Sequence, residues 1–252
     1  MSNVLLEIES LCKKYNDKEV VSGESFKVLE GDILGFIGPN GAGKSTSINM
    51  FTTIVSPDTG NIYYKGKDID NQQNTFKRSL GVVPQELAIY EDLSAYDNVK
   101  FFCSLYGFRG SELKRRTKEA LEFVGLWDRY KEFPTKFSGG MKRRLNIACA
   151  IAHSPKILIM DEPTVGIDPQ SRNKIMQTIK DLNASGTTVI YTSHYMEEIE
   201  TLCNRIVLID KGVIIEDLDK SLYKNKYLKF GCKTLEDIFL YLTGTDLRDL
   251  EG

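Results

Sequence analysis

Residues 38–46 read GPNGAGKST and constrain this chain more than any other stretch. The pattern matches G-x-x-x-x-G-K-[ST], a phosphate-binding loop. Glycines have no Cβ, so the backbone can turn tightly, come close to a ligand and point successive N–H groups at anionic oxygens. A helix that starts at the end of the loop adds its positive N-terminal pole. We expect Lys44 to reach the β- and γ-phosphates of a nucleotide and the Ser45 hydroxyl to bind Mg²⁺.

The flanks of this loop have the required strand–loop–helix setting. Residues 32–37 form an apolar run of strand length that leads straight into the loop, and residues 47–55 place apolar side chains at helical spacing before Pro57. The other residues expected to surround the phosphates are Gly38, Pro39, Asn40, Gly41, Ala42, Gly43 and Thr46.

Strand-like and helix-like segments alternate along most of the chain, which predicts a mostly parallel sheet covered by helices on both faces. Strands are expected at 4–9, 24–29, 61–67, 80–84, 156–161, 187–192, 205–210 and 213–215. Helices are expected at 141–152, 170–183, 195–202 and 234–243. The predicted fold class is α/β, a P-loop NTPase core with a small antiparallel β subdomain from the N-terminal strands.

Strand-like runs vanish between residues 86 and about 135, where 98–106 and 111–124 both have helical patterns. We expect a helical insert subdomain there. In the second helix Leu113 and Leu121 share one face, and a run of basic and acidic residues lies off it. That run is interpreted as a solvated helix face.

Charge and cysteine usage exclude some classes of protein. The net charge is −2, so no basic field favours nucleic acid. The five cysteines, an odd number with no C-x-x-C pair, fit a reduced, cytosolic compartment. The N-terminus lacks the basic region of a signal peptide, and no run approaches the roughly 18 apolar residues of a membrane span. Work at a membrane would therefore need another chain.

Asp161 ends a buried apolar strand and Glu162 follows it. The carboxyl ends of parallel strands form the ligand edge of an open α/β sheet. We expect Asp161 in the Mg²⁺ shell and Glu162 to orient or deprotonate an attacking water. Taken without the phosphate loop, a pair of solvated strand-end acids would explain these residues equally well.

Three further side chains follow predicted strands or helices. Gln85 could touch the metal or the water, or could be a solvated loop glutamine. His194 could meet the γ-phosphate, although a lone histidine can also be structural. His153 is interpreted as a cap of the helix before it.

Ser138, Gly139 and Gly140 precede another predicted helix and form a second helix start that could bind an anion. One nucleotide does not need two such helix ends from one chain. A second copy of the chain could supply the other.

These motifs together resemble the nucleotide-binding subunit of an ATP-binding cassette (ABC) transporter, from residue 4 to about 215. Their order and spacing make the resemblance specific. The matching pieces are Tyr15, the 38–46 loop, Gln85, the segment 137–141 (FSGGM), 161–164 (DEPT), 166–169 (GIDP) and His194.

The resemblance implies roles for single residues. Tyr15 resembles the aromatic residue that stacks on adenine, and Gln85 resembles the loop glutamine that couples Mg²⁺ to a membrane subunit. Asp168 resembles the aspartate that links the two sites of a dimer, and His194 the switch histidine. The segment that contacts the γ-phosphate held by the opposite subunit contains Ser138, Gly139 and Gly140.

The resemblance also implies an activity and partners: ATP hydrolysis with Mg²⁺, head-to-tail closure of two cassettes over two ATP molecules, and movement of separate integral membrane permease subunits. The second cassette could be the same chain or a paralogue. The protein would be cytoplasmic and peripheral on the inner face of the cell membrane. The segment 137–141 corresponds to the family's signature, but it has Phe137 and Met141 where the family has Leu and Gln. Met141 and the stretches 192–198 and 235–244 are similar to the exporter branch, in which the ATPase and the permease are separate chains.

Two other functions fit the sequence less well. A non-transport ABC ATPase acting on ribosomes or DNA usually carries two cassettes or a long coiled coil, and this chain has one cassette and a short insert. A regulator with degenerate catalysis would be expected to lose Glu162 or His194, and both are present. The expected domains are an ABC ATPase domain at 4–230, with its helical insert at about 86–135, and a C-terminal helical appendix at 231–252.

Overall fold

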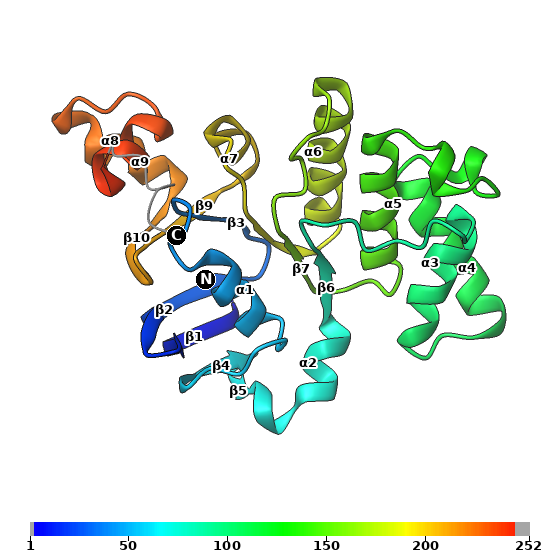
Figure 1. Ribbon diagram of the computed structural model, residues 1–252, viewed down its shortest axis with the longest axis horizontal. Coiled ribbons are helices and arrows are strands. Elements are labelled where there is room, and N and C mark those ends of the chain that lie inside the picture. The colour runs from blue at the N-terminus through cyan, green and yellow to red at the C-terminus, as the bar shows by residue number, and fades with distance from the viewer. Residues whose placement is uncertain (1–2, 245–252) are drawn as a thin grey trace. The chain divides into compact units, whose positions relative to one another are not determined.

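Figure 1 shows the computed structural model, which describes residues 3–244. The chain folds into two compact units. Unit 1 comprises residues 1–77 and 188–252, and unit 2 comprises residues 78–187. The last eight residues of the predicted C-terminal appendix lie outside the described residues.

An antiparallel sheet forms the N-terminal part of unit 1. Its strands are β1 (Val4–Tyr15), β2 (Lys18–Leu29), β4 (Thr59–Tyr64) and β5 (Lys67–Asp68), in the order β2-β1-β4-β5. Ile8 pairs with Phe26 on one side and Ile62 on the other, and all three are buried. Alternating apolar side chains thus line the face of the sheet that is turned to the core.

The second sheet of unit 1 carries the phosphate loop. Within this unit its strands are β10 (Val213–Asp219), β9 (Arg205–Asp210), β3 (Ile33–Ile37) and β8 (Thr188–Tyr191), in that order. β3 runs parallel to both β8 and β9, and β10 returns antiparallel to β9. All five residues of β3 are buried, as expected for a central parallel strand.

The helices of unit 1 include α1 (Lys44–Phe51), which follows the loop. Phe26, Phe36 and Phe51 join β2, β3 and α1 through ring contacts of 5.6–5.7 Å between centroids. The other helices are α7 (Met196–Leu202), α8 (Lys220–Tyr227) and α9 (Leu235–Thr243), with 3₁₀ turns at Ile69–Asn71 and Leu228–Phe230. Helix α2 (Gln73–Ser79) crosses the boundary between the units.

Unit 2 combines two parallel strands with a group of helices. β6 (Leu80–Val83) pairs with β7 (Ile157–Met160). The helices are α3 (Ala95–Leu105), α4 (Gly110–Phe123), α5 (Gly139–Ile151) and α6 (Pro169–Ala184), with 3₁₀ turns at Trp127–Arg129 and Pro134–Lys136. Residues 86–135 contain helices and turns, and no strand is assigned within this fully described range.

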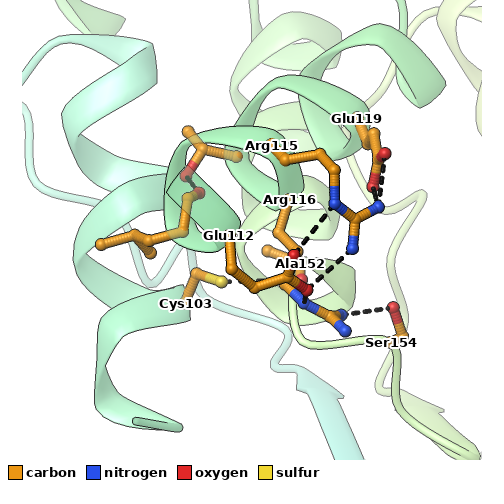
Figure 2. Close-up of polar contacts among 9 residues, drawn as sticks. Cys103, Glu112, Arg115, Arg116, Glu119, Ala152 and Ser154 are labelled. Carbon is orange, nitrogen blue, oxygen red and sulfur yellow. Dashed lines mark hydrogen bonds and ion pairs between the residues drawn. The ribbon is translucent and has the colours of Figure 1, made fainter. Parts of the chain in front are cut away.

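The charged run on α4 is a solvated face, as predicted. Figure 2 shows Arg115 held between Glu112 and Glu119, with the shorter nitrogen–oxygen distance of each pair 2.7 Å. Arg116 donates to Glu112 and to the Ser154 hydroxyl. Exposed pairs of this kind contribute only about 0.3–0.5 kcal/mol each, so the buried Leu113 and Leu121 hold α4 in place.

The predicted α/β class, with mostly parallel strands and a small antiparallel sheet, is confirmed, but several boundaries were wrong. β1 continues to Tyr15 and β2 begins at Lys18, because bulges in their pairing after Ile8 interrupt the alternation that marks a strand in sequence. α1 starts inside the motif at Lys44 and ends at Phe51, before the expected stop. Helices α2 and α8 were not predicted.

Among residues 3–244, no helix is both long enough and apolar enough to cross a membrane.

Candidate nucleotide-binding and catalytic site

The phosphate loop joins β3 to α1 in unit 1, and two of its glycines are required by sterics. A Cβ on Gly38 would lie 2.3 Å from the carbonyl oxygen of Ile209. Gly43 has a φ of +109°, and a Cβ there would lie 2.8 Å from the carbonyl oxygen of Val20. The loop is therefore pressed against β9 and β2 so closely that only glycine fits at both positions.

The N-terminus of α1 is open to an anion. Gly43 is the N-cap and offers no side chain to the first-turn N–H groups, and residues 44–47 (KSTS) contain no acid. The Lys44 ammonium donates to the carbonyl oxygens of Gly38 (2.7 Å) and Pro39 (3.0 Å), so it lies over the loop. Ser45 is exposed beside it. Positive charge, N–H groups and a hydroxyl thus converge at one helix end.

Tyr15 and His194 are the other predicted site residues of unit 1. Tyr15 ends β1 with 44% of its surface exposed, and the Lys13 ammonium lies 5.7 Å from its ring centroid. His194 is exposed in the loop between β8 and α7. Both side chains are accessible to a ligand.

Sequence reasoning missed Glu198, which fixes the loop that carries His194. Its side chain is 1% exposed, and its Oε2 accepts hydrogen bonds from the hydroxyls of Tyr191 and Ser193, both at 2.7 Å. The Ser193 hydroxyl in turn accepts from the Tyr195 backbone N–H at 3.0 Å. The two neighbours of His194 in sequence are therefore tied to one buried carboxyl.

Gln85 and Glu162 meet in unit 2. Val83 and Met160 are paired at the ends of parallel strands β6 and β7, so the residues after them emerge at one edge. There the Gln85 side-chain amide donates to Glu162 Oε2 at 3.2 Å. Asp161 leaves the same edge, with its N–H bonded to the carbonyl of Val83 at 2.9 Å.

Glu162 has an unusual backbone conformation. Its φ is +46°, a left-handed value that is uncommon for a residue with a long side chain, and the residue is 7% exposed. Such backbone strain persists where the surroundings over-determine it and is concentrated at functional sites.

Arg143 was also missed by sequence reasoning. It lies on α5, is 4% exposed, and donates to the carbonyl oxygens of Pro84 (2.7 Å) and Gln85 (2.6 Å). The guanidinium thus holds the backbone of Gln85. In the sequence it is one of three consecutive basic residues at 142–144, so nothing marks it as buried.

The second predicted helix terminus is present in unit 2. Ser138 is the N-cap of α5, and its hydroxyl accepts from the Met141 N–H at 3.3 Å. Asp168 is the N-cap of α6, where its Oδ1 accepts from the Ser171 N–H at 2.9 Å. Hydrogen bonds from Ser171 lower the pKa of the Asp168 carboxyl.

These two helix ends lie together. A Cβ on Gly140 would lie 2.2 Å from the Ser171 hydroxyl and 3.7 Å from Asp168 Oδ2. Ser138 and Gly139 are exposed, whereas Gly140 is buried against α6.

The two departures from the family signature share one neighbour. Phe137 is buried and lies 5.5 Å from the Arg129 guanidinium, and an Arg129 N–H donates to the Met141 sulfur at 3.3 Å. Thioether sulfur is a weak acceptor, so Met141 keeps a weaker polar contact than an amide would make.

His153 does not cap α5, and that interpretation was wrong. Its Nε2 lies 2.8 Å from the carbonyl oxygen of Leu80 on β6, and its ring stacks on Tyr106 with centroids 3.5 Å apart. Burial lowers the pKa of this imidazole to about 4. His153 is a core residue that satisfies the first carbonyl of a strand.

The candidate residues therefore form two sets. Unit 1 holds Tyr15, the loop 38–46 and His194, and unit 2 holds Gln85, Ser138, Gly139, Gly140, Asp161, Glu162 and Asp168. Within the described part of the chain, no three His, Cys, Asp or Glu residues form a group that could hold a metal ion. Magnesium needs no such group, because it is commonly bound through one or two protein oxygens and the phosphates of a nucleotide.

Comparisons with known proteins agree with this arrangement. A family model described as "ABC transporter" matches residues 21–165. The linearmycin resistance ATP-binding protein LnrL of Bacillus subtilis is 52% identical over 211 residues, which are 84% of this chain and 68% of LnrL. A Nod factor export ATP-binding protein I of Paraburkholderia xenovorans is 37% identical over 237 residues, 94% of this chain and 77% of the relative.

Solved structures share the fold. The ATP-binding subunit of an ABC transporter superposes with a TM-score of 0.82 at 28% identity and covers 94% of this chain and 99% of its own. The ATP-binding cassette MJ0796, solved as a dimer in a post-hydrolysis state with ADP and Pi, gives 0.76 at 26% identity over 85% of this chain and 98% of its own. The chain therefore belongs to the ABC transporter family, as one of its ATP-binding proteins.

Proposed function

We propose that this chain hydrolyses ATP as the energy-supplying subunit of an ABC exporter whose membrane subunits are separate chains. The observation that carries the proposal is the contact between Gln85 and Glu162 at 3.2 Å. This contact joins Glu162, whose carboxyl is suited to activate water, to Gln85, which lies in the loop that couples to the membrane subunit in the family that this chain resembles. ATP hydrolysis itself is the activity of the family.

Nucleotide binding would rest on unit 1. The N–H groups of residues 38–46 and the Lys44 ammonium are suited to the β- and γ-phosphates. The exposed Tyr15 ring offers a face on which adenine can stack. A hydroxyl and a carboxylate, Ser45 and Asp161, are ligands that suit Mg²⁺, with Gln85 as a further oxygen donor; the ion would neutralise phosphate charge.

Hydrolysis would proceed by in-line attack of a water molecule on the γ-phosphorus of ATP. The new bond joins the water oxygen to phosphorus as the bond to the β–γ bridging oxygen breaks, which gives ADP and phosphate. Glu162 is proposed to orient the water and accept its proton. His194, held through its neighbours by Glu198, is proposed to donate to the γ-phosphate.

A second ATP-binding chain would complete each site. Ser138, Gly139 and Gly140 start a helix whose N–H groups can bind phosphate, and Asp168 starts the adjacent helix. In the proposed head-to-tail dimer this surface meets the γ-phosphate held by the opposite chain. The dimeric MJ0796 structure supports such an assembly for a relative of similar fold.

The membrane partner would bind unit 2 beside Gln85. Large apolar side chains are exposed in the segment that follows Gln85 and on α3: Leu87, Tyr90, Phe101 and Leu105. Tyr90 packs on Phe101 with ring centroids 5.3 Å apart, and the buried Asn98 bonds both the N–H and the carbonyl of Tyr90. Exposed apolar side chains of this kind suit a cytoplasmic helix of a permease, which would place the protein at the inner face of the cell membrane.

The direction of transport is proposed from the relatives. LnrL is named for linearmycin resistance and the Nod factor proteins for export. We propose outward transport for this chain as well.

The test uses purified Glu162→Gln in size-exclusion chromatography with Mg·ATP or Mg·ADP, beside ATPase assays of the wild type. We expect the variant to form a dimer with ATP alone, because the closed state persists when hydrolysis is blocked. Glu119→Gln, on the solvated face of α4, is the matched control and should hydrolyse ATP as the wild type does.

A wild type without ATPase activity, alone and with its permease, would contradict the proposed enzyme. If Glu162→Gln stays monomeric alone but dimerises when the permease is present, the membrane subunits align the two copies. ATPase activity stimulated by ribosomes or DNA and indifferent to the permease would overturn the transport role.

A further inference from the structure

Glu24 occupies a core position of β2. The inward-facing residues Glu24, Phe26 and Val28 are 0%, 4% and 0% exposed. Phe26 packs on Phe36 of β3 and Phe51 of α1, so this face of the strand lies in the apolar interior of unit 1. Burying a carboxyl among such side chains is costly unless it has a partner.

The partner lies on the helix that follows the phosphate loop. The Ser47 hydroxyl is 2.6 Å from Glu24 Oε1, to which it donates, and 3.2 Å from the carbonyl oxygen of Gly43, the N-cap of α1. The other carboxyl oxygen, Oε2, is buried without a hydrogen-bond partner among the described residues. One donor for two oxygens solvates a carboxylate poorly, so the neutral acid is favoured.

The surroundings of Glu24 are otherwise apolar on the side of β1, where Leu11 is its paired residue. On α1 the one charged side chain is Lys44, which donates to loop carbonyls. Further charged groups on the neighbouring elements are Glu7, Glu9, Lys13 and Lys14 on β1, Lys211 before β10, and Glu216, Asp217 and Asp219 on β10. Burial raises the pKa of Glu24 to about 7, against a smaller lowering by the Ser47 hydrogen bond.

We infer that Glu24 is a positioning residue for the phosphate-binding loop. Through its hydrogen bond with Ser47, Glu24 holds the first turn of α1 in the conformation that binds nucleotide, and it does so best when it is uncharged. The inference rests on the proposed nucleotide site. A negative charge beside this turn would compete with phosphate for the positive end of the helix. Bound phosphates in turn favour the protonated acid, so binding is coupled to protonation of Glu24.

The consequence is a pH dependence of nucleotide affinity. A group whose pKa rises on binding makes affinity higher below its free-state pKa and lower above it. Affinity should therefore decrease as pH rises through neutrality. The phosphates of the nucleotide also titrate and would change Kd in any variant. The informative quantity is therefore the ratio of the wild-type Kd to the Kd of Glu24→Gln. Glutamine keeps the shape of the side chain and an acceptor for the Ser47 hydroxyl but has no charge.

The experiment measures Kd for a fluorescent ADP analogue by anisotropy, using the full chain. Between about pH 6 and about pH 8.5 we expect the wild-type Kd to increase roughly threefold to tenfold more than that of Glu24→Gln, as a pKa change of half to one unit requires. Ser47→Ala removes the donor that lowers this pKa, so the midpoint of its pH profile should move upward.

A purely structural role is tested with Glu24→Val. An apolar side chain fills this core position without a buried carboxyl, so the melting temperature should stay equal or rise. Positioning through Ser47 is nevertheless lost, and Kd should be roughly threefold to tenfold weaker than that of Glu24→Gln even at low pH. Asp32→Asn is the matched control: Asp32 is a second buried carboxyl of unit 1 with a raised pKa, and its loss should leave the pH profile unchanged.

Two results would overturn the inference alone: Glu24→Gln with the same pH profile as the wild type, or Glu24→Val with wild-type affinity. Lys44→Ala should abolish binding in both the wild-type and Glu24→Gln backgrounds. A wild type that binds no nucleotide would instead overturn the proposed site, and the inference with it.

Discussion

Buried ionisable side chains fix the segments that carry or adjoin the candidate site residues. Arg143 bonds the carbonyl of Gln85, Glu198 bonds the hydroxyl of Ser193, and Glu24 bonds the hydroxyl of Ser47. Each of them makes its bond from within the core, where a lost partner leaves an unsatisfied polar group. A small set of buried hydrogen bonds thus positions Gln85, the residue before His194 and the first turn of α1.

Arg143→Met tests this at the residue scale. Methionine keeps much of the side-chain length but leaves the carbonyls of Pro84 and Gln85 without their donors, which should cost about 2–4 kcal/mol of unfolding free energy. We expect kcat for ATP hydrolysis to fall roughly tenfold, about 1.4 kcal/mol in activation free energy, with little change in nucleotide Kd. Chemical denaturation, ATPase assays and equilibrium binding measure the three quantities.

Arg115→Met on the exposed face of α4 is the control and should cost at most about 1 kcal/mol. Should Arg143→Met lower stability while kcat per folded molecule stays at the wild-type value, Arg143 would be structural and would not position Gln85.

Residue types in the motifs could be predicted from sequence, but these supporting residues could not. The glycines and Lys44 have a fixed spacing set by phosphate binding, so a local pattern reveals them. Glu24 and Ser47 are 23 residues apart, and Arg143 and Gln85 are 58 apart. No local sequence pattern marks such pairs. A buried arginine such as Arg143 cannot be told from an exposed one such as Arg115 by its residue type.

At the scale of elements, two helix starts are packed so tightly that glycine is required between them. The N-caps Ser138 and Asp168 begin α5 and α6, and Gly140 lies between them. Both helices were predicted from the sequence, at 141–152 and 170–183, but their close approach depends on tertiary packing. The lengths of β1 and β2 were likewise hidden, because bulges break the period of two.

Gly140→Ala tests whether this packing forms the surface for the second chain. The added Cβ would lie 2.2 Å from the Ser171 hydroxyl and 2.3 Å from Ser171 Cβ, so α5 and α6 must move apart. In a Glu162→Gln background we expect loss of the ATP-dependent dimer by size exclusion, while nucleotide Kd at the loop in unit 1 is retained.

Ser171→Gly removes the clashing atoms and should restore the dimer when combined with Gly140→Ala. Gly139→Ala places its Cβ 3.7 Å from Ile167, an ordinary contact, and should leave the melting temperature nearly unchanged. A dimer that survives Gly140→Ala would argue against this surface as the one that meets the second chain.

At the scale of the whole molecule, two buried titratable groups act on global stability in opposite directions. The pKa of Glu24 is raised from 4.5 to about 7, so the unfolded chain loses its proton first and stability falls as pH rises through that range. The pKa of His153 is lowered from 6.5 to about 4, so the unfolded chain gains its proton first and stability falls as pH decreases through that range.

The wild type should therefore show nearly constant stability between about pH 4.5 and 6.5, where the two effects overlap. Glu24→Gln leaves the histidine effect, so its unfolding free energy should fall with decreasing pH, by at most about 3 kcal/mol. His153→Gln leaves the carboxyl effect and should show the opposite slope, even if lost stacking on Tyr106 lowers its absolute stability. Urea denaturation of the three proteins across this pH range measures the slopes. Equal slopes in both variants would show that neither group controls the pH dependence of folding.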